Sequence, residues 1–399
     1  MSAENTDILI SGGGVAGLTA AAAFAAAGFR TICVDPAPPV TSEGAAGADM
    51  RSTAFLQPSR RVLEAAGLWD RLAPHAAPLR IMRIVDAGGA EPVARLTRDF
   101  DASELSDQPF GWNFPNWLLR REMVARLADL PLADFRPGVA VAGLLTRTMG
   151  AEVTLSDGAR IHARLVVAAD GRNSFVREAA GIPVRTTRYG QKALAFAVTH
   201  PIPHENVSTE IHRSGGPFTL VPLPDRDGLP SSAVVWMERA TEAERLAALP
   251  VAEFEAAMTE RSTGILGPLT LVTRRAVWPM MTQIAARFSA QRVALIAEAA
   301  HVIPPIGAQG LNMSLADLAC LLDLARTSPE TLGEEAMLSA YARRRRAEVL
   351  LREIGIDALN RTSMLAPRPL RDLRAGVLGA LYGLPPVRRA LMRAGLGIR

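Results

Sequence analysis

The chain of 399 residues is long enough for one large interleaved domain or for two to three smaller ones. Its composition, 49% hydrophobic and 21% charged, is that of a folded globular protein and excludes a disordered chain. Two cysteines exclude a disulfide framework and indicate a reducing, cytoplasmic setting, and six scattered histidines predict no metal site.

The first 35 residues predict a strand, a glycine-rich loop, a helix and a second strand. The apolar runs 8–10 and 31–34 are typical of buried parallel strands, and the Ala-rich run 18–27 is typical of a helix. Residues 8–27 are also long enough to suggest a signal peptide or a membrane anchor. No basic residue precedes Arg30, and three glycines interrupt the segment where such a helix would begin, so we reject the membrane interpretation.

The loop of this unit contains G-x-G-x-x-G, the motif of dinucleotide sites. The first glycine allows a tight turn, the second lets backbone N–H groups approach a pyrophosphate, and the third lets the helix pack on the strand. An acid at the end of the second strand can accept hydrogen bonds from an adenosine ribose, as in FAD or NAD. The cofactor-binding residues predicted here are Gly12, Gly14, Val15, Ala16, Gly17, Asp35 and Pro36.

The following segments alternate between two patterns. Helical periodicity appears at 59–72, 116–130 and 242–260, and β-patterned runs appear at 79–96, 139–155, 161–169 and 191–237. These patterns predict an α/β fold in which a Rossmann-like domain is interleaved with an antiparallel β-sheet substrate domain, plus C-terminal helices. The boundaries we assign are 1–75, 111–185 and 276–360 for the first domain, 76–110 and 186–275 for the second, and 361–399 for a basic helical segment.

Two polar positions on loops are candidate ligand contacts. Arg51 follows a Pro- and Gly-rich loop and would suit a pyrophosphate or a flavin edge, although a lone arginine is more often a surface charge. Asp170 and Gly171 end the strand at 161–169, where doubly wound sheets place ligand contacts. The alternative for the Asp-Gly pair is an ordinary turn.

A second informative stretch covers residues 298–312. It contains an acid, Glu298, then a Pro/Gly loop, and then a helix from about 311 to 326. Backbone N–H groups and a helix N-terminus that meet at one place can stabilise a developing negative charge. A reduced flavin carries such a charge on its ring, and the loop residues proposed to stabilise it are Pro305, Gly307 and Gly310. His301 would be a base or, as we favour, a structural side chain beneath the loop.

The charge of the chain is asymmetric. Residues 341–399 contain 13 Arg and four acids, a local balance of +9, which leaves about −5 for the remainder of a chain of net charge +4. Helical spacing of Arg with apolar residues, as in 369–392, favours an anionic membrane surface or an acidic partner over nucleic acid. A solvated helix face is an alternative of nearly equal weight.

Together these pieces resemble the FAD-dependent aromatic hydroxylases, the single-component flavin monooxygenases typified by para-hydroxybenzoate hydroxylase. The resemblance spans nearly the whole chain and rests on three motifs, which are Gly12-x-Gly14-x-x-Gly17, Asp170-Gly171, and Glu298-Ala-Ala-His301 followed by Pro304-Pro305 and Gln309-Gly310-Leu311-Asn312. Secondary matches are Asp49-x-Arg51, Arg120-x-x-Met123 and Tyr341-x-x-x-Arg345. Within the family the chain is most similar to the ubiquinone-biosynthesis hydroxylases, which share Gly67-Leu68-Trp69 and Gly216-Pro217.

The resemblance implies roles for individual residues. Gly12, Gly14 and Gly17 would face the FAD pyrophosphate, and Asp35 would face the adenosine ribose. Arg51 and Arg120 would contact the flavin nucleotide. Asp170 and Gly171 would serve the pyrophosphate and NAD(P)H access, and Glu298 would reach the ribityl chain. The residues that would pack against the isoalloxazine ring are Pro305, Gly310, Leu311 and Asn312.

Two positions depart from the family pattern. The family usually has Gly-Asp where this chain has Ala297-Glu298, and it has Gly at the position of Ala308. Glu is one methylene longer than Asp, and Ala disfavours a positive φ. Both departures raise the question of whether FAD binding is weakened.

The resemblance also implies an activity. NAD(P)H would reduce FAD, dioxygen would give a flavin 4a-hydroperoxide, and one oxygen would pass to an aromatic ring, such as that of a polyprenylated phenol or quinol in ubiquinone biosynthesis. No residue is evident as an essential acid or base. Whether NADH, NADPH or a separate reductase supplies electrons stays open, as do the ring position and the oligomeric state.

Rival interpretations differ in class. The same chemistry on a soluble phenolic substrate is one, and a FAD-deficient, non-catalytic subunit of a quinone-biosynthesis complex is another. A flavin halogenase lacks support, because Trp-x-Trp-x-Ile-Pro is absent and Lys192 is the only lysine. A plain NAD dehydrogenase would leave residues 298–312 unexplained.

The expected partners are an aromatic substrate and oxygen, without nucleic acid. The expected location is cytoplasmic, with peripheral contact to the inner face of the membrane through the basic segment.

Overall fold

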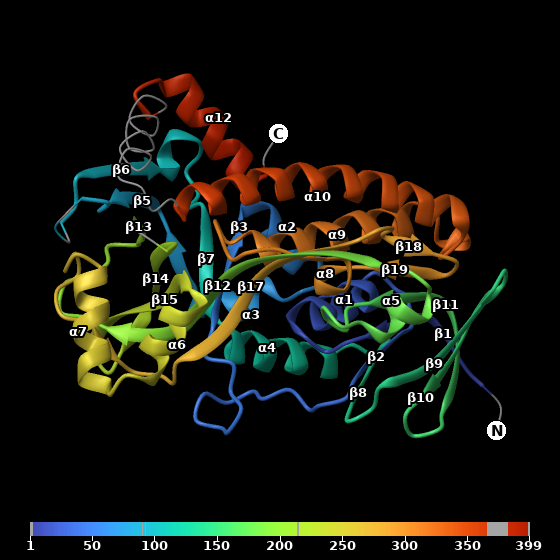
Figure 1. The fold of residues 1–399 in the computed structure, drawn as a ribbon. Helices are drawn as coiled ribbons and strands as arrows, with labels where there is room; N and C mark the ends of the chain where they lie inside the picture. Colours follow the sequence, from blue (N-terminus) through green and yellow to red (C-terminus); the bar gives the residue numbers. More distant parts are fainter. Residues whose placement is uncertain (1–2, 90, 92, 214, 365–381, 398–399) are drawn as a thin grey trace.

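The computed structural model describes residues 3–89, 91, 93–213, 215–364 and 382–397. Within these ranges the fold is α/β, with a mainly parallel sheet beside a long, mainly antiparallel sheet, a small third sheet, and helices that include two near the C-terminus (Figure 1). This arrangement confirms the predicted fold class.

The first sheet contains the predicted βαβ unit. Its central strands are parallel in the order β19-β11-β1-β2-β8, while β18, β10 and β9 extend it by antiparallel pairing. Its central apolar strands are buried on both faces because helices cover them, as is usual for parallel sheets. The strands are β1 (Glu4–Ser11), β2 (Thr31–Asp35), β8 (Ala133–Pro137), β9 (Val141–Arg147), β10 (Gly150–Leu155), β11 (Arg160–Ala168), β18 (Ser289–Ala290) and β19 (Val293–Leu295).

The second sheet has nine strands in the order β20-β17-β12-β15-β14-β13-β5-β6, with β16 paired to β12. Figure 1 shows it beside the first sheet, with α6 and α7 against its outer side. Its strands are β5 (Ile81–Asp86), β6 (Leu96–Asp101), β12 (Val184–Thr199), β13 (Val207–His212), β14 (Pro217–Arg226), β15 (Leu229–Arg239), β16 (Thr270–Leu271), β17 (Ala276–Ala285) and β20 (His301–Val302).

The two faces of this second sheet have different neighbours because side chains alternate along a strand. On β12, Leu194 and Val198 pack into a buried cluster that includes Phe254 of α7. The intervening side chains, Ala193 and Ala195, line a cavity on the opposite face. The sheet therefore separates a hydrophobic core from a cavity lined by small side chains.

The third sheet and the remaining helices connect these layers. The small sheet has the order β3-β7-β4, with strands β3 (Ser52–Leu56), β4 (Ala77–Leu79) and β7 (Gly111–Pro115). The helices are α1 (Val15–Ala26), α2 (Gln57–Ala65), α3 (Trp69–Leu72), α4 (Asn116–Ala128), α5 (Phe175–Ala179), α6 (Ala240–Ala248), α7 (Val251–Arg261), α8 (Ala297–Ala300), α9 (Gln309–Thr327), α10 (Glu335–Ser363) and α12 (Pro385–Leu396), with short 3₁₀ turns at Ala73–His75, Ala102–Glu104 and Pro329–Thr331.

Several predicted elements need correction. The helix expected over 59–72 is divided into α2 and α3 at Gly67, whose φ of 67° ends a helix. The helix expected over 242–260 is divided at Pro250 into α6 and α7, since proline interrupts a helix. Strand β17 was not predicted because it contains Pro279, which pairs with Lys192 next to an irregularity in the ladder. Of the helical segment expected over 369–392, residues 369–381 lie outside the described residues and the rest lies in or beside α12.

Candidate functional site

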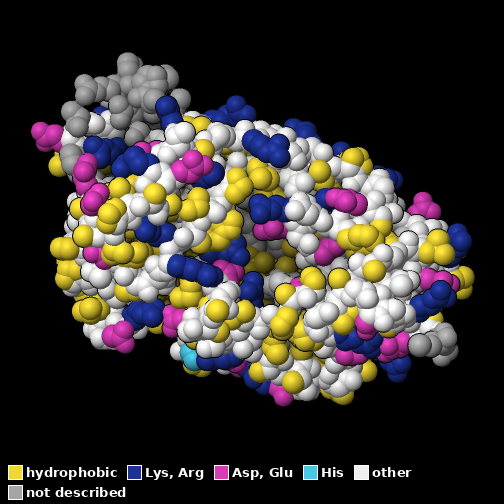
Figure 2. All heavy atoms as spheres, turned by 60° about the horizontal axis from the view of Figure 1, so that its bottom comes forward, with side chains coloured by type: hydrophobic (Ala, Val, Ile, Leu, Met, Phe, Trp, Pro, Cys, Tyr) yellow, Lys and Arg dark blue, Asp and Glu magenta, His cyan; other side chains and the backbone are white. Residues whose placement is uncertain are grey.

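A cavity of about 530 Å³ lies where the three sheets meet. Its wall is formed by the N-terminus of α1, the loop before α9, strand β3, and the inner face of the second sheet. Figure 2 shows one face of the molecule with a central hollow that has basic and acidic side chains around it. The predicted site residues that line the cavity are Gly14, Val15, Ala16, Arg51, Arg120, Gly171, Glu298, Pro305, Gly307, Gly310 and Leu311.

The glycines of the first loop divide into two kinds. A Cβ on Gly12 would lie 2.3 Å from the carbonyl oxygen of Ala169. A Cβ on Gly17 would lie 1.9 Å from the carbonyl oxygen of Gly12. Both positions therefore require glycine for packing. A Cβ on Gly14 would meet no protein atom within 4 Å and would project into the space that Gly14 lines. Gly14 is the N-cap of α1 without a side-chain cap, so the first N–H groups of the helix, at Val15 and Ala16, lie at the cavity without a side-chain partner. This arrangement fits the pyrophosphate of a dinucleotide.

Asp35 holds the same loop from the end of β2. One carboxylate oxygen accepts from the Gly13 N–H at 2.6 Å, and the other accepts from the Ala37 N–H at 2.9 Å. The carboxylate is therefore fixed beside the glycine loop, while Pro36 is exposed. The ribose contact of these two residues stays a prediction.

A cluster of charged side chains borders the cavity at β3. Asp49 accepts hydrogen bonds from Arg51 at 2.6 Å, Asn116 at 3.1 Å and Arg120 at 3.4 Å. Burial alone would raise the pKa of Asp49, but the hydrogen bond and charge of Arg51, with help from Asn116 and Arg120, hold it below its ordinary value. The Arg51 guanidinium also lies 4.9 Å from the ring centroid of Trp278 on β17, so a cation–π contact joins the residue before β3 to the second sheet.

The loop before α9 presents a second helix N-terminus to the cavity. Gly307 and Ala308 both have positive φ, 61° and 56°, and Ala308 is the N-cap of α9 without a side-chain cap. Asn312 ties the first turn to β3, because its Oδ1 accepts from the Leu56 N–H at 2.8 Å and its Nδ2 donates to Ala54 O at 2.7 Å. The helix end is thereby fixed with its positive dipole at the cavity, which suits an anionic ring.

A buried ionic cluster supports this loop from behind. Asp317 on α9 is fully buried and accepts from His301 Nε2 at 2.6 Å, Arg345 Nε at 2.8 Å and the Ala297 N–H at 3.1 Å. Burial by itself would raise the pKa of Asp317, but the charges and hydrogen bonds of His301 and Arg345 lower it. His301 is buried with its Nε2 bonded to Asp317, and it also lines the cavity. Its structural role stays a prediction.

Asp170 has a local role at the end of β11. Its carboxylate accepts from the Ser174 hydroxyl and from the Val176 N–H, so it closes the turn that begins α5. Burial raises the pKa of Asp170, and these hydrogen bonds oppose the rise. Gly171 and not Asp170 lines the cavity, and the pyrophosphate contact of Asp170 stays a prediction.

The inner face of the second sheet supplies an apolar wall. Small and branched side chains line it, among them Ala193, Ala195, Val221 and Val235. Glu210 is one of the polar side chains at this wall, and its Oε1 lies 2.7 Å from the Nε2 of His212. A wall of this composition accepts an aromatic or aliphatic ligand.

Two alanines, at the positions that depart from the family pattern, adopt a left-handed backbone. Ala297 has φ 55° and Ala308 has φ 56°, both in the left-handed region, which costs about 1–2 kcal/mol for a residue with a Cβ. Replacing both by glycine is expected to raise the free energy of unfolding by up to about 1 kcal/mol, because relief of strain exceeds the entropy cost of glycine. Thermal denaturation measures the change. As a control, Ala316→Gly within α9 should lower the free energy of unfolding by about 1 kcal/mol. An equal loss of stability in the double variant and in Ala316→Gly would contradict backbone strain at Ala297 and Ala308.

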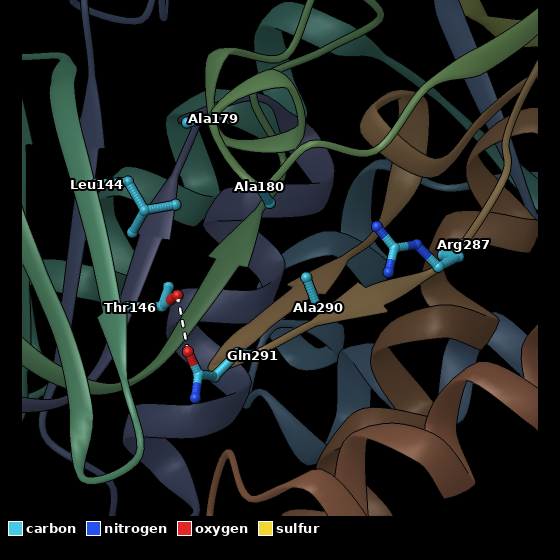
Figure 3. Close-up of a pocket in the computed structure, with 7 residues that line it drawn as sticks. All are labelled: Leu144, Thr146, Ala179, Ala180, Arg287, Ala290 and Gln291. Atoms are coloured by element: carbon cyan, nitrogen blue, oxygen red, sulfur yellow. Dashed lines mark hydrogen bonds between the residues drawn. The ribbon is translucent and has the colours of Figure 1, made fainter.

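A second, smaller cavity of about 230 Å³ lies near the surface between β9, α5 and β18 (Figure 3). The Thr146 hydroxyl donates to Gln291 Oε1 at 3.1 Å beside it, and Arg287 is exposed at its edge. No predicted site residue lines it, and it brings together no set of reactive side chains. We assign it no role.

Residues that the sequence analysis missed include Asp317 and Trp278. An acid within the apolar run 313–322 is a signal for a buried ion pair, and this signal was available in the sequence. Trp278 lies on the unpredicted strand β17, so its place opposite Arg51 had no sequence signal. Across the described residues, no group of three or more His, Cys, Asp or Glu side chains has the arrangement of a metal site.

Comparisons with known proteins agree with this geometry. Residues 5–351 match the family described as FAD binding domain. The chain is 35% identical to ubiquinone hydroxylase UbiL of Rhodospirillum rubrum over 98% of this chain and 89% of that protein, and 27% identical to 3-demethoxyubiquinol 3-hydroxylase of Escherichia coli over 100% of both. In fold it is similar to p-nitrophenol 4-monooxygenase PnpA of Pseudomonas putida, with a TM-score of 0.80, 20% identity and 99% of each chain covered.

The match to the family model spans most of the chain, and the relative from Rhodospirillum rubrum is similar over nearly its whole length. The cavity, with its glycine loop and two uncapped helix ends, is compatible with a bound dinucleotide. The chain therefore belongs to the family of FAD-dependent aromatic hydroxylases that includes the ubiquinone hydroxylases.

Proposed function

We propose that this monooxygenase hydroxylates the ring of a polyprenylated phenol or quinol in ubiquinone biosynthesis. The observation that carries the proposal is the larger of the two cavities described above, in which two uncapped helix N-termini oppose an apolar wall. Similar proteins whose names specify ubiquinone or demethoxyubiquinol hydroxylation support the choice of substrate class.

Some of the residues that we propose to hold FAD line the cavity, and the others are not among its lining residues. Gly14 and the first N–H groups of α1 would bind the pyrophosphate, Asp35 the adenosine ribose, and Arg51 and Arg120 the flavin nucleotide. Glu298 would reach the ribityl chain. The remaining predicted contacts are Gly12, Val15, Ala16, Gly17, Pro36, Asp170, Gly171, Pro305, Gly310, Leu311 and Asn312.

Bound FAD would supply the redox and oxygen-transfer chemistry, and the protein would supply position and field. The N-terminus of α9, with Gly307 at its start, would stabilise negative charge on the reduced ring. The apolar wall of β12, β14 and β15 would exclude water and receive the substrate. The segments 1–75, 111–185 and 276–360 would form the FAD-binding domain, and 76–110 with 186–275 would form the substrate domain.

Two further parts of the proposal concern partners. NAD(P)H is the proposed reductant, and the basic C-terminal segment 361–399 is proposed to contact the inner membrane surface or partners in a biosynthetic complex. Among the described helices, none combines the length and apolarity needed to cross a bilayer.

The test begins with the purified protein, FAD and ¹⁸O₂. We expect about one FAD per chain in the visible spectrum and, with NADH or NADPH and a short-chain prenyl phenol, a product that contains one labelled oxygen atom. A matched phenol without the prenyl group, hydroxylated equally well, would favour the soluble-substrate alternative. A spectrum without flavin after reconstitution would contradict the proposal and favour a non-catalytic subunit.

A further inference from the structure

The outer face of α10 is apolar and exposed over its second half. Leu351, Ile354 and Leu359 are 73%, 67% and 57% exposed. Ala347 before them and Gly355 and Ala358 between them are also exposed. Positions three, four, seven and eight apart share one side of a helix, so these residues form one stripe. The opposite side of α10 is buried through Val349 and Ile356.

Positive charge lies at the N-terminal end of this stripe. Arg343, Arg344 and Arg346 are exposed before it, and Arg344 pairs there with Asp323. The acids on this part of α10 are each engaged by a cation, since Glu348 pairs with Arg345, Glu353 with Arg185, and Asp357 with Arg361. The exposed surface therefore combines a hydrophobic centre with a basic end at Arg343 and Arg346.

Helix α12 continues this surface toward the cavity. It lies beside α10, because Gln309 Nε2 donates to Gly395 O at 2.9 Å while Gln309 Oε1 accepts from Arg352 of α10 at 2.5 Å. Figure 1 shows both helices along one edge of the molecule. Leu384 before α12 and Leu391 within it are exposed, at 55% and 49%.

The inner side of α12 packs on the wall of the cavity. Met392 and Leu396 are buried in a cluster with Leu56, Phe110 and Met82, and these last three line the cavity. The Arg388–Glu104 ion pair, at 2.8 Å, fixes α12 in this position. Helix α12 thus separates its exposed residue Leu391 from the proposed substrate cavity.

We propose that the α10 face, defined as Leu351, Ile354, Leu359, Leu384 and Leu391 with the flanking arginines, docks on an anionic phospholipid bilayer. Apolar residues would enter the headgroup boundary while Arg side chains bind lipid phosphates. The inference rests on the proposed function for its purpose, since docking would place α12 and the cavity beside a membrane-borne prenyl substrate.

The experiment is sedimentation of the FAD-loaded full chain with vesicles of phosphatidylcholine alone or of equimolar phosphatidylcholine and phosphatidylglycerol. We expect binding to the anionic vesicles only. Leu351→Gln with Ile354→Gln should weaken that binding by at least about tenfold, and Arg343→Gln or Arg346→Gln by about fivefold each. The matched control, Met149→Gln with Val251→Gln, alters two residues that are 80% and 52% exposed on other elements and should bind like the unchanged protein.

Several outcomes would overturn the docking surface. Equal loss in the control pair, equal binding to neutral vesicles, or no vesicle binding would each do so. A change from dimer to monomer in the Leu351→Gln, Ile354→Gln variant, without a change in vesicle binding, would assign the face to self-association instead. Hydroxylation of a short-chain phenol in detergent-free solution is measured in parallel, so that failure of the proposed function is distinguished from failure of docking.

Discussion

Replacing Gly14 by valine is expected to abolish FAD binding while the protein without cofactor stays folded. The position has an extended backbone, φ −70° and ψ 176°, which valine adopts readily, and no protein atom would meet the new Cβ within 4 Å. The side chain would instead occupy the space in front of the α1 N-terminus, where the pyrophosphate is proposed to bind. We expect the Kd for FAD to rise at least about a hundredfold, which corresponds to about 3 kcal/mol.

Titration of the apoprotein with FAD, followed by flavin fluorescence, measures this loss, and thermal denaturation measures the apoprotein. Stability should fall by no more than about 1 kcal/mol, the usual cost of a poor N-cap residue. Gly17→Ala is the matched contrast, because its Cβ would lie 1.9 Å from the Gly12 carbonyl oxygen. It should destabilise the fold itself by about 3 kcal/mol. Unchanged FAD affinity in Gly14→Val would show that the pyrophosphate does not bind at this helix end.

Asp317→Asn is expected to give the largest loss of stability among single side-chain changes in the site. The substitution removes the charge that compensates buried Arg345 and the acceptor shared by His301 and the Ala297 N–H. Breaking a buried ion pair in this way costs about 3–5 kcal/mol. Denaturant unfolding of the variant measures it.

A control acid is available on the same helix. Asp323 is 68% exposed and pairs with Arg344 at 3.4 Å, so Asp323→Asn should cost less than about 1 kcal/mol. Similar losses in the two variants would contradict the importance of the buried cluster. The FAD affinity of Asp317→Asn should also fall, because the loop at Ala297 loses its anchor.

The same cluster predicts a dependence of stability on pH. The pKa of Asp317 is lower in the folded protein than its ordinary value, so its contribution is fully present above pH about 4 and is lost as the pH falls through the folded value. The unfolding free energy of the unchanged protein should therefore decrease more steeply on acidification below pH about 4 than that of Asp317→Asn. Parallel curves for the two proteins would contradict this assignment.

The sequence alone identified the parts of the site that depend on local spacing. The G-x-G-x-x-G loop, the strand before it and the Pro/Gly loop before α9 are read from neighbouring residues, because turn geometry and helix starts depend on a few consecutive positions. The positive φ at Ala297 and Ala308 was not predicted, because alanine disfavours that backbone, and only the structure showed it. Local pattern also separated buried strands from amphipathic helices.

Tertiary structure alone decided which distant residues meet. Asp317 pairs with residues 16 and 28 positions away, and Arg388 pairs with Glu104 across 284 positions. Such pairings depend on how helices pack and on which side of each element is buried, and no local pattern encodes that choice. The sequence therefore determined the kind of cofactor site, and the packing of α9, α10 and α12 around it decided how the site is supported and where the cavity meets the surface.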